Sequence, residues 1–382
     1  MINLVIHKSM QEIPSDQWNA LVLDNNPLVS HEFLFAMEKF HCVGEKFGWI
    51  PCHLAVYEEK EQVKQLVAAM PLYVKFNSYG EFVFDNSWAD AYQRNGLKYF
   101  PKLVSSIPYT PAQGQRMLCQ AGMESLYFPL LLKMAKEFAV EQKLSSFHCL
   151  FPADNEQDFF EQQNMLVRHD CQFHWSNHDY EDFDDFTSRL TSRKRKNIRK
   201  EREAVSKAGV SLRRLNGHTA TDKDWSDFAV FYHKTFEEKW GMATFNKDFF
   251  ASIASSLPDN ILLVLADLDG ECIAGSLMYV SDTTLYGRHW GCTEDVDQLH
   301  FEACYYQGIE FCIEKGLKRF EPGAQGEHKI ARGFLPVLTR SSHWVESDVF
   351  QKPIEDFCLQ EREGVAAYMV QLEKKNPYKE SL

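Results

Sequence analysis

The sequence predicts a mixed α/β protein built from two copies of one unit. Met165-Leu166 and His174-Trp175 recur with the same spacing 169 residues later, as Phe334-Leu335 and His343-Trp344. Leu66-Val67-Ala68 and Tyr73-Val74 correspond in the same way, 206 residues later, to Cys272-Ile273-Ala274 and Tyr279-Val280. Matches that keep their order while the offset varies with loop length indicate an internal duplication. A common order of strand-like and helix-like segments in the two halves is the third observation.

Hydrophobic periodicity gives the elements of the first half in order. We expect a strand at 2–7, helices at 14–22 and 30–40, strands at 51–57, 66–76 and 81–84, an irregular stretch at 87–116, a helix at 124–142, a strand at 145–151, a helix at 154–164 and a strand at 171–175. Ser30 is a suitable N-cap for the second helix, because its side chain can accept from a backbone N–H of the first turn.

The second half gives a similar list. We expect a helix at 183–207, a strand at 210–215, helices at 222–239 and 246–257, strands at 261–267, 271–281 and 284–291, a helix at 298–315, a strand at 318–321 and a C-terminal tail helix at 353–373. Asp269-Gly270 is typical of a hairpin turn. The predicted units are residues 1–176 and 177–382.

Composition excludes several classes of protein. No apolar run is long enough to span a membrane, and the first residues lack the pattern of a signal peptide. The ten cysteines contain no CxxC pair, so neither a disulfide framework nor a metal site is indicated. A net charge of −13 argues against broad coating of nucleic acid, although one local basic patch remains compatible with it. We therefore expect a cytoplasmic protein, and the sequence does not indicate its oligomeric state.

The stretch 320–344 is the main candidate for a functional site. Gly323 and Gly326 can provide a tight turn between a strand and a short helix, and ionisable side chains follow at once. The candidates are Gln325, Glu327, His328, Lys329 and Arg332. Loops at strand ends are where α/β proteins place binding and catalytic groups. The alternative is a solvated turn that is merely rich in charge.

These residues suggest separate roles. Glu327 stands at a helix start, where negative charge is favoured, and His328 can exchange a proton near neutral pH. Lys329 and Arg332 can hold an anionic group of an acceptor. We expect them to line a cleft that faces residues of two neighbouring segments.

The first of these segments is the strand 284–291. Tyr286, Arg288 and Trp290 alternate along it and are expected on one face. An arginine there needs an acidic partner or an anionic ligand. Glu321 and Glu327 are the candidate partners, and a carboxylate or phosphate on the acceptor is the alternative.

The second segment is the helix 298–315. Glu302 and Tyr306 are four residues apart and therefore share a face. A carboxylate and a phenol can serve as the base and acid of amine acylation, and a structural Glu–Tyr hydrogen bond explains the same spacing. His300 and Cys304 form a second such pair, which helix packing explains better than a nucleophile does.

The order of elements resembles the GNAT acyltransferase fold, and two copies in tandem resemble the FemAB-like transferases. The resemblance is narrower to the FemAB-like family described as "peptidoglycan biosynthesis/recognition". In the second half it rests on LYGRHWG at 285–291, LHFEACYYQGIE at 299–310 and FEPGAQGEHKIARGFLP at 320–336. In the first half it rests on NPLVSHEFLFAME at 26–38 and YTPAQGQRML at 109–118.

The resemblance implies acyl-CoA as a donor, with its pyrophosphate held on backbone N–H groups of a glycine-rich turn. The corresponding stretch of the second unit, 291–298, has three acids and a single glycine, so it should repel a pyrophosphate. In the first unit, Gln113, Gly114 and Arg116 resemble a degraded form of the turn. A plain surface turn is the alternative.

Relatives that use aminoacyl-tRNA direct attention to a basic run between Arg189 and Arg202. It contains eight cations, and Phe186, Leu190 and Ile198 give it an apolar stripe, as expected for a packed helix. The run is either a phosphate-binding surface for tRNA or another nucleotide-linked substrate, or a solvated helix face.

Together these observations predict an N-acyltransferase that moves an acyl or aminoacyl group to an amine of a small molecule, peptide or cell-wall precursor. The alternative is a non-catalytic protein of the same fold that binds a peptidoglycan precursor or peptide.

Overall fold

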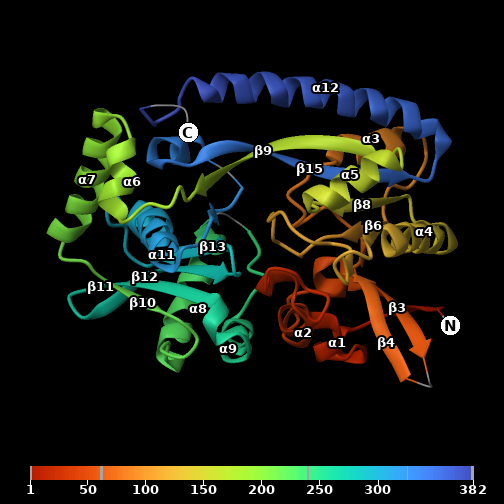
Figure 1. The fold of residues 1–382 in the computed structure, drawn as a ribbon, viewed down its shortest axis with the longest axis horizontal. Helices are drawn as coiled ribbons and strands as arrows, with labels where there is room; N and C mark the ends of the chain where they lie inside the picture. Colours follow the sequence, from red (N-terminus) through yellow and green to blue (C-terminus); the bar gives the residue numbers. More distant parts are fainter. Residues whose placement is uncertain (1, 61–62, 239–240, 325, 380–382) are drawn as a thin grey trace. The chain divides into compact units, whose positions relative to one another are not determined.

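The computed structural model describes residues 2–60, 63–238, 241–324 and 326–379 (Figure 1). The chain forms two compact units. Unit 1 comprises Met1–Asp170 with Leu338–Ala367, and unit 2 comprises Cys171–Val337 with Tyr368–Leu382. The predicted boundary at 176/177 is close to the division at 170/171. That residues 338–367 belong to unit 1 was not predicted, because a buried strand pattern does not reveal which unit the strand completes.

Unit 1 contains two sheets. The first is antiparallel in the order β1-β3-β4-β7, and the second contains β2-β5-β6-β8-β15, in which β6 and β8 are parallel. The strand bounds are β1 Ile2–His7, β2 Trp49–Pro51, β3 His53–Lys60, β4 Val63–Met70, β5 Tyr73–Lys75, β6 Lys102–Ser105, β7 Leu118–Cys119, β8 Ser146–Leu150 and β15 Leu335–Val345. The helix bounds are α1 Ser15–Asn19, α2 His31–Lys39, α3 Asn86–Arg94, α4 Glu124–Glu141 and α5 Asp154–Gln162. As predicted, Ser30 caps α2, accepting from the N–H of Phe33 at 3.3 Å.

Unit 2 is organised around one sheet in the order β10-β11-β12-β13-β14-β9. The strand bounds are β9 Leu166–Ser176, β10 Ser211–Leu215, β11 Ile261–Leu268, β12 Glu271–Val280, β13 Thr284–Cys292 and β14 Arg319–Glu321. The pair β13–β14 is parallel, like β6–β8 of unit 1. Of the segments matched in the sequence comparison, residues 66–68 lie on β4 and residues 73–74 on β5, whereas residues 272–274 and 279–280 both lie on β12. The other matched pair, His174-Trp175 and His343-Trp344, lies on β9 and β15. The predicted single strand at 66–76 is therefore wrong: it is two strands that belong to different sheets.

Helices cover both faces of the unit 2 sheet. The bounds are α6 Phe183–Arg189, α7 Ser192–Lys207, α8 Asp222–Glu238, α9 Lys247–Ser256, α10 Leu299–Phe301 and α11 Gln307–Lys315. Phe228 and Phe231 of α8 pack against β12 at Gly275. Ile309 of α11 packs with Leu262 and Val264 of β11, whose side chains lie on the other face.

Three further local predictions were wrong. Residues 81–84 form no strand, because Glu81 turns inward to pair with buried Lys102 at 2.7 Å. The stretch predicted to be irregular contains α3 and β6; buried Trp88 and Tyr92 anchor α3. The predicted helix 183–207 is two helices, since buried Leu190 is extended and forms a bridge with Tyr378.

Helix α12 spans Asp348–Glu373 and begins five residues before the predicted start. None of the helices in the described residues is long and apolar enough to span a membrane.

Candidate active site

The two parallel strands of unit 2 separate where the candidate residues lie. β13 and β14 pair at Thr284–Tyr286 and Arg319–Glu321, and in the part of the chain that the structure describes their pairing ends there. A cavity of about 300 Å³ opens at this point and is lined by Ser276, Gly287, Arg288, His289, Trp290, His300, Cys304, Tyr305, Pro322, Gly323, Ala324, His328 and Lys329. Gly287 permits the close approach: a Cβ there would lie 3.1 Å from the Cα of Pro322. The strand separation thus builds a polar cavity in the sheet.

A β-bulge places Arg288 at this cavity. Leu277 of β12 pairs with His289 and Met278 pairs with Gly287, which leaves Arg288 as the extra residue on β13. Bulges of this kind re-aim side chains beside functional sites. Burial lowers the pKa of Arg288 to about 10, and the charge of Glu321 acts in the opposite direction. The bulge also breaks the predicted alternation: Arg288 and Trp290 line the cavity, whereas Tyr286 does not.

Lys329 provides a buried ammonium in the same cavity. Gly323 and Gly326 adopt φ values of +94° and +113°, which favour glycine, and the short helix Glu327–Arg332 follows. This turn brings the Nζ of Lys329 to 2.7 Å from the carbonyl oxygen of Gly323, to which it donates. Lys329 is only 2% exposed, and burial lowers its pKa to about 8. At neutral pH this lysine is still charged but loses its proton readily.

His328 lies at the mouth of the cavity. Its Nε2 is 2.9 Å from the hydroxyl of Tyr305, and its ring lies against Phe301. Partial burial and the charges of Arg332 and Lys329 lower the pKa of His328, so the imidazole is neutral at pH 7. A neutral imidazole hydrogen-bonded to a phenol can accept a proton and pass it on.

A π-helical turn, Glu302–Tyr306, separates α10 from α11 and decides which side chains reach the cavity. π-helical turns are rare in proteins, and those that occur are often found at functional sites. His300, Cys304 and Tyr305 line the cavity. Burial raises the pKa of the Cys304 thiol to about 12, which agrees with a packing role for this residue and not with a thiolate nucleophile.

Glu302 and Tyr306 face away from the cavity, toward α7. The carboxylate of Glu302 accepts from Nε and Nη2 of Arg202 at 3.1 and 3.0 Å. The hydroxyl of Tyr306 donates to Glu201. The two residues do share a helix face, as predicted, but that face is a packing interface between helices of unit 2.

The remaining predicted residues of this region are placed as follows. Glu327 is exposed and accepts from Tyr368 at 2.8 Å and from Lys375 at 2.5 Å, so the structure does not pair it with Arg288. Arg332 pairs with Glu201 at 2.9 Å. Glu321 is buried and lies 3.0 Å from Arg319. Gln325 lies outside the described residues.

The turn at residues 113–116 belongs to unit 1, and its backbone N–H groups donate to other groups of the same unit. The N–H of Gly114 donates to the carbonyl of Phe151 at 3.1 Å. The N–H groups of Arg116 and Met117 donate to the buried carboxylate of Glu156 at 2.8 and 2.6 Å. An internal carboxylate therefore stands where an external anion was expected.

The side chains of this turn are also engaged within unit 1. The Arg116 guanidinium donates to the carbonyl oxygens of Ala112, Gly114, Gln115 and Leu150. Gln113 donates to Asp154 at 2.9 Å. These residues do not fit a cradle for the pyrophosphate of acyl-CoA, and we derive no step through that group.

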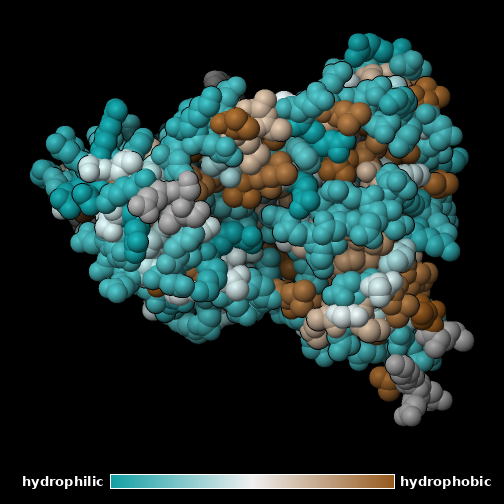
Figure 2. All heavy atoms as spheres, turned by 45° about the horizontal axis from the view of Figure 1, so that its top comes forward, coloured by the Kyte–Doolittle hydropathy of each residue, from teal (hydrophilic) through white to brown (hydrophobic). Residues whose placement is uncertain are grey.

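Helix α7 separates its charges onto two faces. Ile198 and Val205 are buried, and Glu201 and Arg202 contact the segments that line the cavity. Six other cations have no acidic partner among the described residues: Arg193, Lys194, Arg195, Lys196, Arg199 and Lys200. The region of α7, at the left of Figures 1 and 2, carries a hydrophilic surface. Of the predicted apolar stripe Phe186, Leu190 and Ile198, all three residues are buried but only Ile198 lies on α7, because the chain is extended at Leu190. The opposite face of α7 presents positive charge.

Sequence reasoning missed Tyr305, His289 and Ser276 as cavity residues. Tyr305 is adjacent to the chosen Tyr306, and only the π turn reveals which of the two tyrosines faces His328. His289 is brought in by the bulge. Ser276 lies in an apolar strand pattern that offers no signal of function.

Comparisons with known proteins agree with this geometry. A family model described as FemAB-like, peptidoglycan biosynthesis/recognition, matches residues 9–380. No curated protein sequence matches the chain.

Several solved structures are similar to this chain in structure and share little sequence with it. FemX is 12% identical with a TM-score of 0.53, and the alignment covers 92% of this chain and all of FemX. A conserved protein of unknown function from Bacteroides thetaiotaomicron is 10% identical with a TM-score of 0.50, covering 90% and 99%. A tandem GNAT protein from the clavulanic acid biosynthesis pathway is 10% identical with a TM-score of 0.45, covering 91% and 99%. The chain has the fold of FemX, and it belongs to the FemAB-like peptidoglycan biosynthesis/recognition family.

Proposed function

We propose that this protein transfers an acyl or aminoacyl group to an amine of a small molecule, a peptide or a cell-wall precursor. The observation that carries the proposal is the cavity between β13 and β14, where Lys329 and the His328–Tyr305 pair converge. Fold alone does not give function, and these groups have the properties that amine acylation needs.

The proposed roles follow from the charges of the groups. Neutral His328 accepts the proton that the attacking amine releases, directly or through the Tyr305 hydroxyl. The ammonium of Lys329 stabilises the negative charge that develops on the carbonyl oxygen of the donor. The amine forms a bond to the carbonyl carbon, the bond to the leaving thiol or alcohol breaks, and the leaving group takes up a proton. Arg288 holds an anionic group of either substrate.

The carrier of the donor group is a separate question, since neither predicted turn fits a pyrophosphate. We propose that the free cations of α7 bind a polyanionic carrier or acceptor, such as aminoacyl-tRNA or a nucleotide-linked precursor. In support, the other face of α7 contacts Glu302 and Tyr306 of the π turn and Arg332 of the short helix 327–332, two segments that also contain cavity residues. All ten cysteines are free thiols, which suits a reducing, cytoplasmic location.

The decisive experiment is a donor–acceptor matrix with mass-spectrometric detection of the product. Donors are short and long acyl-CoAs and charged tRNA, and acceptors are free amines, peptides and UDP-linked muropeptides. Product formation that is lost in Lys329→Met and kept in the control Glu327→Gln supports the transferase. Saturable binding of a muropeptide with no product from any donor supports the non-catalytic alternative.

The role of α7 needs its own comparison. Charge reversal at Lys194, Lys196 and Lys200 should weaken the binding of the polyanionic substrate and reduce the dependence of its affinity on salt concentration. Reversal of Lys133, an exposed lysine of α4, is the matched control. An unchanged salt dependence in the α7 variant would identify this face as merely solvated.

A further inference from the structure

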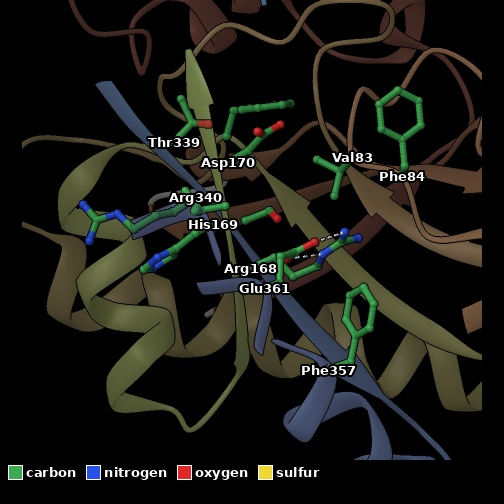
Figure 3. Close-up of a pocket in the computed structure, with 12 residues that line it drawn as sticks. Val83, Phe84, Arg168, His169, Asp170, Thr339, Arg340, Phe357 and Glu361 are labelled. Atoms are coloured by element: carbon green, nitrogen blue, oxygen red, sulfur yellow. Dashed lines mark hydrogen bonds and ion pairs between the residues drawn. The ribbon is translucent and has the colours of Figure 1, made fainter. Parts of the chain in front are cut away.

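Unit 1 contains a second cavity, of about 370 Å³, which shares no lining residue with the candidate active site of unit 2. It lies among strands β9 and β15, helix α12 and the irregular segment at 83–84 (Figure 3). Its volume is within the range of small-molecule sites, roughly 300–1,000 Å³. Its lining combines apolar side chains with polar and charged ones. The apolar residues are Val83, Phe84, Phe151, Phe357 and Val365, and the polar and charged residues are Arg168, His169, Asp170, Thr339, Arg340, Ser341 and Glu361.

One cationic side chain lies among these apolar groups. Arg168 is 7% exposed and forms a bidentate pair with Glu361, with Nε and Nη2 at 2.8 and 2.5 Å from the carboxylate oxygens. In Figure 3 its guanidinium lies between Val83 and Phe357, whereas Arg340 and His169 point to the opposite side. Arg168 is thus the charged group on the apolar side of the cavity.

Two polar atoms of the cavity residues lack a hydrogen-bond partner among the described residues. They are Nη1 of Arg168 and Oγ1 of Thr339, and both are buried. Buried polar atoms are nearly always paired, and leaving them unpaired costs free energy. Both residues line the cavity, so an acceptor on a ligand bound there can satisfy them.

The backbone around the cavity is strained in a way that agrees with a binding role. Phe151 and Phe82 have φ values of +52° and +60°, a region that bulky side chains rarely adopt. Phe151 lines the cavity, and Phe82 directly precedes Val83 and Phe84. Phe84 is 65% exposed, so a large aromatic side chain is held in solvent at the edge of the cavity. Strain of this kind is concentrated at ligand sites.

The charge of the cavity decides which ligand fits. The guanidinium of Arg168 is already neutralised by Glu361, so a second carboxylate would gain little and would be repelled by Glu361. A neutral carbonyl oxygen can accept from Nη1 without this repulsion. We propose that this cavity of unit 1 binds a neutral carbonyl compound, an amide or ester, that carries an aromatic or branched apolar group.

The test is a binding measurement on the full chain by isothermal titration calorimetry, with two probes that differ in charge. The probes are 3-phenylpropanamide and 3-phenylpropionate. Saturable binding of the amide, about tenfold tighter than that of the acid, is expected. Equal or tighter binding of the acid, or no saturable binding of the amide, would overturn the proposal.

Variants locate the site. Phe84→Ala should weaken amide binding about tenfold, because it removes an aromatic wall, while Phe76→Ala, at a phenylalanine 55% exposed and outside the cavity, should not. Arg168→Lys keeps a cation for Glu361 but removes Nη1, the proposed donor to the ligand carbonyl. It should therefore reduce the preference for the amide over the acid. Thr339→Val, which breaks no hydrogen bond of the free protein, should weaken the amide by about threefold to tenfold.

If the affinity for the amide is unchanged in Phe84→Ala, or in both Arg168→Lys and Thr339→Val, then the amide binds elsewhere and the proposal for this cavity is wrong. None of these residues belongs to the cavity of unit 2, so the outcome is independent of the proposed transferase activity.

Discussion

Replacing Lys329 with methionine should make the protein more stable at neutral pH while removing its activity. Burial lowers the pKa of this lysine from its ordinary value of 10.5 to about 8. Since a tenfold change in proton affinity corresponds to about 1.4 kcal/mol, keeping the ammonium buried at pH 7 costs about 3 kcal/mol. The substitution also removes the hydrogen bond to Gly323, which contributes about 1 kcal/mol. The net gain in unfolding free energy is then about 2 kcal/mol at pH 7.

The sign of the pH dependence follows from the same values. Below pH 8 the lysine is protonated in both the folded and the unfolded chain, so the full cost is present. Between pH 8 and 10.5 the unfolded chain binds the proton and the folded chain does not, so the wild-type protein becomes more stable as pH rises. The advantage of the variant should therefore shrink over this interval and disappear near pH 10.

Urea unfolding of both proteins from pH 7 to 10, followed by tryptophan fluorescence, measures this difference. A parallel turnover assay, with the substrates found in the donor–acceptor matrix, should show loss of product. If Lys329→Met lowers the unfolding free energy at pH 7, or if the difference between the two proteins does not change with pH, the reasoning about a costly buried ammonium is wrong.

Three further predictions concern the same unit. His328→Ala should lower kcat by about 10²–10⁴-fold with the fold intact, measured as initial rates with circular dichroism as the control; a near-normal rate would remove His328 from the mechanism. Arg202→Met should cost about 3–5 kcal/mol in urea unfolding because it leaves the carboxylate of Glu302 buried without a cation, with only the Gln307 amide still donating to it, and adding Glu302→Met should restore most of the loss. Gly287→Val should abolish substrate binding, because its side chain would meet Pro322 where β13 and β14 separate; calorimetry that finds unchanged affinity would show that this separation is not used.

The repeated unit could be predicted from the sequence because the periodicity of its strands and helices is a local property of the sequence. Leu66 and Cys272 begin equivalent buried stretches on β4 and β12, and strand periodicity is readable wherever one face is buried. Helix α3 and strand β6 could not be predicted, because the segment 87–116 contains three prolines and two glycines and because Lys102, a residue of β6, is buried as an ion. Strands are predicted from apolar residues at buried positions and polar residues at exposed ones, and a buried ionised lysine breaks this rule.

Part of the candidate site could be predicted for a similar reason. The glycine turn led directly to His328 and Lys329, since backbone freedom followed by ionisable groups is a local signal. The facing residues depend on two irregularities, the bulge at Arg288 and the π turn at Glu302–Tyr306, each of which adds one residue to a regular element. One extra residue turns the following side chains to another face, so spacing rules gave Glu302 and Tyr306 where the structure has Tyr305.

The assignment of residues 338–367 to unit 1 has a consequence for synthesis on the ribosome. Domains usually fold from the N-terminus as they emerge, at roughly 5–20 residues per second. Unit 1 receives its first 170 residues early but must wait for almost 200 more before β15 and α12 arrive. That interval is roughly 10–40 seconds, during which the edge of β8 that pairs with Ser341–Val345 has no partner. The nascent chain therefore exposes an unpaired strand edge until translation is nearly finished, and slow translation of the second half would prolong its exposure to aggregation.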